Sequence, residues 1–564
     1  MTARGSRAPW RGTRSLLLQG GNIYSPSAPF STAMLIVGDT IAWIGEDTAA
    51  AVHRDAADVV INLDGAFVAP GFVDAHVHAT STGLMITGLD LTAARSREEL
   101  LDRLRVEADH VRGSWGPDAV VLGHGWDESR WDDPALPTRE DIDTAAGGAQ
   151  VYLSRIDVHS ALVSTSLVEG TQGADAMAGW HPTHSVSQQA HISLRAHALT
   201  LITSEQRIQA QRGMRSAAAE LGIVAVHEMA GPGISGPDDL LSLLDLADSE
   251  PGPLVVGYWG ESAQTGGVDR ALELGAVGAA GDLFVDGAIG SHTACLHDSY
   301  ADDPESTGAS YLTVAEISEH LIASTTAGMQ AGFHVIGDLA SHRVSEGARN
   351  AARALGTDAL RQAGHRLEHA EMLSDDDIEV MAELGITASM QPLFDELWGG
   401  PRGMYEARLG AARTLSMNRF ADIASAGVAL AFGSDSPVTP LGPWAAVRAA
   451  MHHTVPAQRL SARAAFSAHT RGGWRAAGSH GTGVLAPGAP AHLAIWDVRE
   501  FEVHAPDERV THWSTDPRSG TPALPVLDPG GALPQCLATI AAGAVIHAKS
   551  GHTLTESLDG GALA

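Results

Sequence analysis

The chain has 564 residues, of which 44% are hydrophobic and 18% charged, with 62 glycines and 27 prolines. This composition is typical of a globular protein with a large core and at least one further module, and it excludes a disordered, collagen-like or coiled-coil chain. The 67 acidic side chains outnumber the 36 basic ones, which gives a net charge of −31. Such a field repels phosphate backbones and anionic lipid, so we expect neither nucleic acid nor a membrane as a partner.

The sequence offers little evidence for membrane insertion, for secretion or for disulfide bonds. No apolar run reaches the ~20 residues of a membrane span, and the apolar stretch at residues 16–18 is too short for the core of a secretion signal. The two cysteines, Cys295 and Cys536, cannot build a disulfide framework. We therefore expect a cytoplasmic protein.

Histidine and lysine counts bear on the chemistry. The 27 histidines are numerous enough to direct attention to metal binding. Lys549 is the only lysine in the sequence, so a mechanism that needs a buried lysine must use Lys549 or be discarded.

The two ends of the chain predict short β-strands. In the first 70 residues these lie at 22–24, 33–37 and 40–44, with Gly38-Asp39 as a hairpin turn. Near the other end they lie at 483–485, 491–496 and 539–546. We expect one composite β-sandwich domain assembled from residues 1–70 and 476–564, and two separate β-appendages are the alternative.

The middle of the chain, residues 71–475, alternates short apolar runs with helical patterns. The apolar runs predict strands at 222–227, 282–286, 331–335, 364–369, 385–390 and 427–432. Alanine-rich stretches at 341–355 and 421–426 suit helices. This alternation favours a parallel sheet, open or closed into a TIM-like (β/α)8 barrel. Residues ~92 to ~195 break the rhythm with many Trp, Asp, His and Gln residues, which indicates an inserted subdomain.

The first candidate site residues are His76 and His78. They end the run Gly71-Phe-Val-Asp-Ala-His76-Val-His78. Side chains alternate along a strand, so both imidazoles point to the same face and can share one divalent cation. With 27 histidines in the chain, such a pair alone is a weak signal.

Three later residues strengthen this signal, because His334, His369 and Asp435 each follow or end a predicted strand. Parallel α/β folds place their active groups at this end of the strands. A barrel of ~250 residues spends ~31 residues on each β/α unit, so the spacing assigns His76, His334, His369 and Asp435 to strands one, five, six and eight. As alternatives, Asp435 could begin a helix before Ser436-Pro437, and the histidines could be ordinary core residues.

A resemblance to a known family rests on motifs spread over nearly the whole chain. They are Gly71–His78, Gly123–Glu128, Phe284–Gly287, His334–Asp338, Arg366–His369, Met390–Pro392, Gly433–Pro437, and the tail at 464–470 and 483–488. Their order and spacing resemble the metal-dependent amidohydrolase superfamily, and more narrowly the branch containing the N-substituted formamide deformylases. The resemblance implies a TIM-like barrel with a composite β-sandwich, a metal-activated water, and hydrolysis of an amide or related C–N bond.

The chain departs from that branch at Asp282. There, the branch typically has a carbamylated lysine that bridges two metals, and this chain has no barrel lysine to replace it. Because the aspartate side chain is several bonds shorter than a carbamylated lysine, we expect one divalent ion, or a weakly held second one, rather than the binuclear centre of that branch. Zinc is the expected metal, although iron, manganese or nickel would suit the same ligands. The alternatives are that Asp282 bridges two metals after all, or that the site has decayed.

We assign roles as follows. His76, His78, His334, His369 and Asp435 are the expected metal ligands, and the ion lowers the pKa of bound water from ~16 towards ~7. Asp435 also acts as general base and then general acid. The expected substrate-binding residues are Trp126, His159, Asp286 and Gln391, the last two at the ends of strands three and seven. Asp338 and Glu368 are expected to orient the imidazoles from behind.

The favoured function is metal-dependent hydrolysis of an amide, N-formyl or cyclic amide bond in a small molecule. A mononuclear deaminase of a heterocyclic amine would use the same ligands on the same barrel. A catalytically silent binding protein is the third candidate. The oligomeric state is open from the sequence, and a homodimer is the common outcome.

Overall fold

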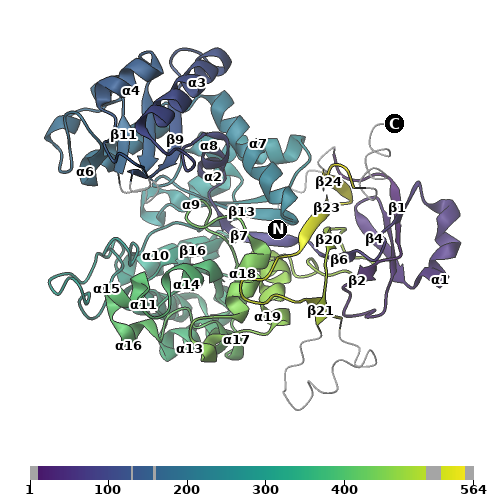
Figure 1. Ribbon diagram of the computed structural model, residues 1–564. Helices are drawn as coiled ribbons and strands as arrows, with labels where there is room; N and C mark the ends of the chain where they lie inside the picture. Colours follow the sequence, from purple (N-terminus) through teal and green to yellow (C-terminus); the bar gives the residue numbers. More distant parts are fainter. Residues whose placement is uncertain (1–9, 129–130, 156–159, 503–521, 553–564) are drawn as a thin grey trace. The chain divides into compact units, whose positions relative to one another are not determined.

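The computed structural model describes residues 10–128, 131–155, 160–502 and 522–552 (Figure 1). The chain divides into two compact units, one made of Met1–His78 and Arg215–Ala564 and the other of Ala79–Met214. In the described part of the chain, every helix is too short or too polar to cross a membrane.

The first unit contains a sheet of eight parallel strands. In order across the sheet they are β7 (Phe72–Val77), β13 (Ile223–Ala230), β14 (Leu254–Trp259), β15 (Gly278–Ala279), β16 (Gln330–Val335), β17 (Arg366–His369), β18 (Thr387–Met390) and β19 (Leu430–Phe432). Most of their residues are buried, as expected for parallel strands covered on both faces. The predicted strands one, five, six and eight are confirmed as β7, β16, β17 and β19.

The two end strands of this sheet, β7 and β19, meet through the segment that follows β19. The backbone N–H of Asp435 donates to the His76 carbonyl at 2.7 Å, and the N–H of His78 donates to the Ser436 carbonyl at 2.9 Å. These bonds bring the eighth strand end beside the first, so the sheet is a nearly closed (β/α)8 barrel.

Helices pack around the barrel strands (Figure 1). They are α8 (Pro237–Ser249), α9 (Gly267–Leu274), α10 (Val314–Thr326), α11 (Asp338–Leu355), α12 (Thr357–Ala363), α13 (Asp375–Leu384), α14 (Pro392–Trp398), α15 (Met404–Leu409), α16 (Ala411–Thr414), α17 (Phe420–Ser425), α18 (Pro443–Met451), α19 (Ala462–Ser467) and α20 (Gly473–Ala476). Two of them start at capping boxes, with Thr313 and Glu316 at α10 and Ser374 and Asp377 at α13.

The strand predicted at 282–286 is wrong. The fourth strand is the two-residue β15, and residues 282–286 make only an isolated bridge from Phe284 to His334 and another from Asp286 to Ser310. Asp286 therefore follows the fourth strand and not the third. A two-residue strand has no hydrophobic pattern to recognise, and the apolar run of 282–286 is buried in a loop beside β16 instead.

The composite β-sandwich is confirmed. One sheet contains β4 (Thr40–Gly45), β3 (Ala33–Val37), β1 (Ser15–Gln19) and β5 (Val59–Asn62), and the other contains β2 (Asn22–Ile23), β6 (Phe67–Pro70), β20 (Leu493–Asp497), β23 (Gln535–Ala541) and β24 (Ala544–Ala548). In the second sheet β6 pairs with β20, with Val68 opposite Ile495, so both ends of the chain share one sheet.

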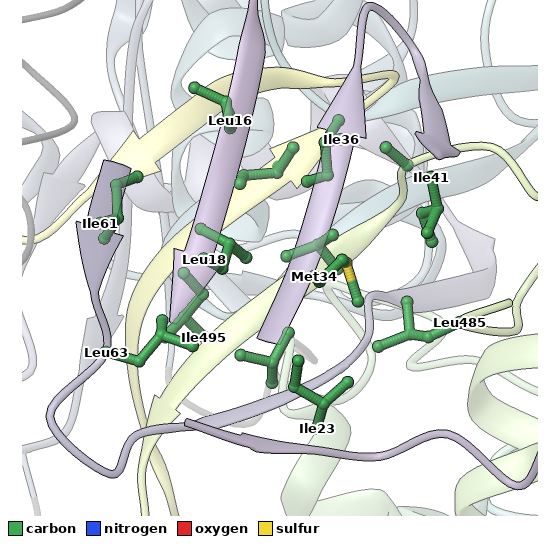
Figure 2. Packing of buried hydrophobic residues seen from close by; sticks show 14 of the residues in the cluster. Leu16, Leu18, Ile23, Met34, Ile36, Ile41, Ile61, Leu63, Leu485 and Ile495 are labelled. Carbon is green, nitrogen blue, oxygen red and sulfur yellow. The ribbon is translucent and has the colours of Figure 1, made fainter. Parts of the chain in front are cut away.

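The core of the sandwich lies between these two sheets. Figure 2 shows Leu16 and Leu18 of β1, Met34 of β3 and Ile495 of β20 gathered in one cluster. The strand predicted at 483–485 is wrong, because this segment has no strand pairing, although Leu485 still packs in the cluster. The predicted residue boundaries of the domains stay predictions.

The inserted subdomain is confirmed as the second compact unit. Along the chain it lies between the first barrel strand and the second. Its sheet contains β8 (Leu89–Asp90), β9 (Val121–Trp126), β10 (Val151–Arg155), β11 (Ser160–Val163) and β12 (Val186–Ser187). Its helices include α2 (Ala79–Thr87), α3 (Arg97–Trp115), α4 (Arg139–Ala146), α5 (Thr165–Glu169) and α6 (Gln188–Thr200), and α7 (Ser204–Glu220) leads out of it. Leu100, Leu104 and Ile142 belong to a core of its own.

Candidate metal centre

Two histidines and two aspartates converge at the ends of the barrel strands. His76 Nε2 lies 3.3 Å from Asp435 Oδ1 and 3.5 Å from Asp282 Oδ1. His78 Nε2 lies 3.2 Å from Asp435 Oδ1 and 3.2 Å from Asp282 Oδ2. All four side chains are buried, so each carboxylate faces both imidazoles of the His-x-His pair.

The backbone that carries these groups is unusual. Asp435 has a φ of 55° and His369 a φ of 70°, in the left-handed region that non-glycine residues rarely adopt. Such conformations cluster at functional sites, where the surrounding structure holds them in place. Gly433 permits the close approach of the two chains, because a Cβ there would lie 2.5 Å from the backbone nitrogen of His76.

His369 and His334 lie beside the first two histidines. The ring of His369 has its centroid 5.0 Å from that of His76 and 4.4 Å from that of His334. Ligand atoms of His76, His369 and Asp435 lie within 4.8 Å of one another, as do those of His76, His78 and Asp282. His334 belongs to neither set, and its Nδ1 lies 4.0 Å from Asp286 Oδ1.

Unpaired polar atoms in this cluster fit a bound cation. Among the described residues, four buried atoms of this cluster make no hydrogen bond of good geometry, although the first and third face each other at 3.5 Å: His76 Nε2, His78 Nδ1, Asp282 Oδ1 and His334 Nδ1. Leaving such an atom without a partner costs about 1–3 kcal/mol, so several in one place require an explanation. Imidazole nitrogens and carboxylate oxygens are ligands of zinc and related divalent ions. The residues present therefore suit a metal ion.

Charge coupling inside the cluster is strong. Burial alone would lower the pKa of His76 and His78, but the carboxylates of Asp282 and Asp435 outweigh burial and raise the pKa of His78 to about 10. The same contacts hold the pKa of both aspartates well below the usual range, against the effect of burial. A metal requires neutral imidazoles and ionised carboxylates. A cation bound here would therefore replace the protons that the two imidazoles share with the two carboxylates.

Two side chains contact the Nδ1 atoms of His76 and His369, the candidate ligand imidazoles. Glu368 Oε2 lies 2.9 Å from His76 Nδ1, and Gln391 Oε1 lies 2.9 Å from His369 Nδ1. Both contacts direct the Nε2 atom of the ring to the cluster, as carboxylate and carbonyl partners do for metal-bound histidines. Burial would raise the pKa of Glu368, but Arg366 outweighs it and lowers that pKa to about 2. Glu368 therefore contacts His76, and its role in orienting a metal ligand stays a prediction.

The other predicted site residues have different surroundings. Asp338 Oδ1 accepts the backbone N–H groups of His297 and Leu339. Asp286 accepts three backbone N–H groups, from Cys295, Ile336 and Gly337, at 2.7–3.0 Å, and is fully buried. Burial outweighs these bonds and raises the pKa of Asp286 to about 7. Both carboxylates thus fasten loops next to His334.

Two predicted substrate contacts come from the inserted unit. Trp126 is buried on β9, where its indole N–H donates to the Leu153 carbonyl at 2.9 Å. Within that unit it is a core side chain. His159 lies outside the described residues.

Sequence reasoning assigned no role to Asp74, which contacts the backbone of His76, or to Arg366, which contacts Glu368. Asp74 Oδ1 accepts the backbone N–H of Ser434 at 2.8 Å, and Arg366 forms a bidentate pair with Glu368. The sequence did hold one signal for these two residues. Side chains two positions apart on a strand share a face, so Asp74 lies on the face of His76, and Arg366 lies on the face of Glu368.

Comparisons with known proteins agree with this geometry. Residues 59–547 match the model of the amidohydrolase family. The chain is similar to the protein LONG AFTER FAR-RED 3 of Arabidopsis thaliana, with 27% identity over 534 residues that cover 87% of this chain and 88% of the relative. It is also similar to the N-substituted formamide deformylase of Arthrobacter pascens, with 23% identity over 467 residues that cover 77% of this chain and 83% of the relative.

A solved structure shows the same likeness. The crystal structure of an uncharacterized metal-dependent hydrolase from Pyrococcus furiosus matches with a TM-score of 0.72 and 26% identity, over 86% of this chain and 99% of the other. The family model matches most of the chain, and histidines and aspartates of a candidate metal centre lie at the ends of the barrel strands. This protein belongs to the amidohydrolase family.

Proposed function

We propose that the protein hydrolyses a C–N bond of a small molecule, in an amide, N-formyl or cyclic amide group, with Asp435 as the general base and then the general acid. The observation that carries this proposal is the position of Asp435 Oδ1, 3.3 Å from His76 Nε2 and 3.2 Å from His78 Nε2. A carboxylate at this point is next to any water that a cation held by the same imidazoles would polarise.

The ligands we propose for the ion are His76, His78, Asp282, His369 and Asp435, with His334 as a further candidate. One ion, zinc by preference, is favoured because the two oxygens of Asp282 face the two imidazoles of a single pair. When bound, such an ion supplies Lewis-acid activation of water and of the substrate carbonyl.

The chain's own residues complete the reaction. Asp435 accepts a proton from the attacking water and later donates one to the leaving nitrogen, which cannot depart as a free anion near neutral pH. Glu368 and Gln391 keep the Nδ1 atoms of His76 and His369 engaged, which fixes the direction of both rings. The catalytic carboxylate is only 6% exposed, so little bulk water competes for its proton.

Deamination is the second candidate, favoured by Glu371. This residue lies two positions after His369, is buried, and has one carboxylate oxygen, Oε2, without a hydrogen-bond partner among the described residues. A deaminase needs an acid near its ligands to protonate the ring of a heterocyclic amine. Burial raises the pKa of Glu371 to about 8, so this carboxyl group is the one that we would assign the role of proton donor.

Metal analysis with an activity panel tests the proposal. The purified protein should hold about one divalent ion per chain, and a chelator should abolish its activity. Turnover of N-formyl or N-acyl amines would support hydrolysis, whereas turnover of aminopurines or aminopyrimidines would support deamination. A protein with neither a bound ion nor chelator-sensitive activity would be a silent relative. A cytoplasmic location and a homodimer stay predictions from the sequence.

A further inference from the structure

Arg366 is a fully buried cation in the interior of the barrel, next to the metal-centre residues. Its guanidinium forms a two-point pair with Glu368, from Nε to Oε1 and from Nη2 to Oε2. Both residues lie on β17 and are separated by one residue, so their side chains share a face. The carboxylate of Glu368 is therefore held in one plane by a fork of two parallel hydrogen bonds.

The same guanidinium also reaches the strand that carries His76. Arg366 Nη2 donates to the carbonyl oxygen of Ala75 at 2.7 Å, and Ala75 is the residue directly before His76 on β7. Glu368 Oε2, in turn, lies 2.9 Å from His76 Nδ1. Arg366 thus acts on His76 along two routes, through its backbone and through the partner of its ring.

Other contacts fix the guanidinium itself. Nη2 donates to Ser389 Oγ on β18 at 2.9 Å, Nη1 lies 3.1 Å from His227 Nδ1 on β13, and the group lies over the ring of Tyr258 on β14 at 4.6 Å. One side chain therefore touches four barrel strands besides its own. A buried ion pair is weak evidence for a gain in stability, because removing two charges from water costs about as much as their attraction returns. The pair calls for another role.

We propose that Arg366 is a positioning residue of the metal centre, which holds His76 in its ligating orientation through Glu368 and through the Ala75 carbonyl. This inference rests on the proposed metal-dependent function. A positive charge alone is not enough for this role. Only a planar guanidinium can donate to both oxygens of Glu368 and to the Ala75 carbonyl at the same time.

Metal affinity tests the inference without any substrate. We would prepare metal-free wild type, Arg366→Lys and Glu368→Gln, and measure zinc affinity by competition with a chromophoric chelator. Near-ultraviolet circular dichroism confirms that each variant is folded. The lysine variant keeps the charge and loses the fork, and the glutamine variant keeps the shape and loses the carboxylate.

Both variants should bind zinc 10- to 100-fold more weakly than wild type, because partners of metal-bound histidines have effects of this size. The double variant should lose less affinity than the two single losses combined, since part of the effect of Arg366 passes through Glu368. Ser345→Ala is the control, because it removes a buried serine hydroxyl that donates to Asp377 and does not contact Arg366, and its affinity should stay within twofold of wild type.

The outcomes are distinguishable. Wild-type affinity in folded Arg366→Lys would overturn the inference and leave the proposed function intact. Absence of zinc binding by the wild type would overturn the proposed function. If Arg366→Lys does not fold, Glu368→Gln decides, and wild-type affinity in that variant would equally overturn the inference.

Discussion

The carboxylate of Asp74 accepts the backbone N–H of Ser434 at 2.8 Å, and so joins the first barrel strand to the segment that follows the eighth. The same oxygen lies 3.3 Å from the backbone nitrogen of His76. One buried carboxylate thus fastens the two pieces of backbone that carry His76 and Asp435, at the seam where the barrel closes.

Replacement of Asp74 by alanine should destabilise this seam. The variant leaves the N–H of Ser434 buried without an acceptor, which costs about 1–3 kcal/mol. Asp74→Asn keeps an acceptor oxygen and should lose less. Denaturant unfolding of both variants measures the difference, and equal losses would show that the acceptor oxygen is not what matters.

Gly433→Ala should disturb the same seam by steric contact. Its new Cβ would lie 2.5 Å from the nitrogen of His76 and 3.0 Å from Asp74 Oδ1, so the two backbones must separate. We expect a loss of about 1–3 kcal/mol in the free energy of unfolding, with weaker metal binding. Gly113→Ala in α3 is the control, because a Cβ there meets nothing within 4 Å, and it should be neutral or mildly stabilising.

Asp435→Asn should separate metal binding from proton transfer. The amide retains an oxygen that can face the imidazoles, but it cannot accept a proton from water near neutral pH. Turnover should fall by about 10²–10⁴-fold, the usual contribution of a general base or acid, while bound metal falls much less. Steady-state kinetics and elemental analysis on one preparation test this, with Asp358→Asn, at an exposed position, as the control. Equal loss of both quantities would mean that Asp435 is only a ligand.

Metal uptake by the wild type should be independent of bicarbonate. Carbon dioxide is needed where a lysine must be carbamylated, and the only lysine of this chain is Lys549, which lies just after β24 in the β-sandwich and donates to Gln535. Asp282 is ready as a ligand because its carboxylate already faces His76 and His78. Elemental analysis after reloading the metal-free protein, with and without bicarbonate, should give about one ion in both cases. A rise to two ions with bicarbonate would refute the argument.

Acid should destabilise the fold between about pH 6.5 and pH 4. Burial lowers the pKa of His365, His469 and His492 to about 4. In this range the three histidines bind protons in the unfolded chain but not in the folded chain. The free energy of unfolding therefore falls as the pH falls, and it levels off below the pKa of these histidines in the folded protein. Each full shift corresponds to about 3 kcal/mol.

One variant isolates this effect. His365 accepts the backbone N–H of Ala331 through Nδ1 at 2.9 Å, and lies against Thr325. His365→Gln should reduce the slope of unfolding free energy against pH in this window, at some loss of stability at pH 7. His480→Gln, at an exposed position, should leave the slope unchanged. An unaltered slope in the first variant would contradict the prediction.

The strands that carry the candidate metal ligands were predictable because their signals are local. The run before His76, and the predicted strands that lead to His334, His369 and Asp435, show where chain elements end, and parallel strands end on one side of a barrel. The length of each β/α unit then fixes the strand number. The sequence did not predict β15, because a strand of two residues has no periodicity to recognise.

Hydrogen-bond partners of buried polar groups were less accessible from the sequence. Asp286 was expected to line the substrate site, yet its oxygens accept N–H groups from residues 295, 336 and 337, which come together only when two loops fold over it. Arg366 stands in a recognised motif, but its contacts to Ala75 and Ser389 depend on the register of neighbouring strands. Such partners are set by tertiary geometry, which one strand's pattern does not contain.

The pairing of β6 with β20 also bears on how the protein folds. Residues 67–70 leave the ribosome early but find their neighbour only after more than four hundred further residues have been synthesised. Until then the early strands present an open edge, which is a hazard for aggregation. Completion of this sheet is therefore a late, long-range event, and the nascent N-terminal segment is where we would look for chaperone dependence.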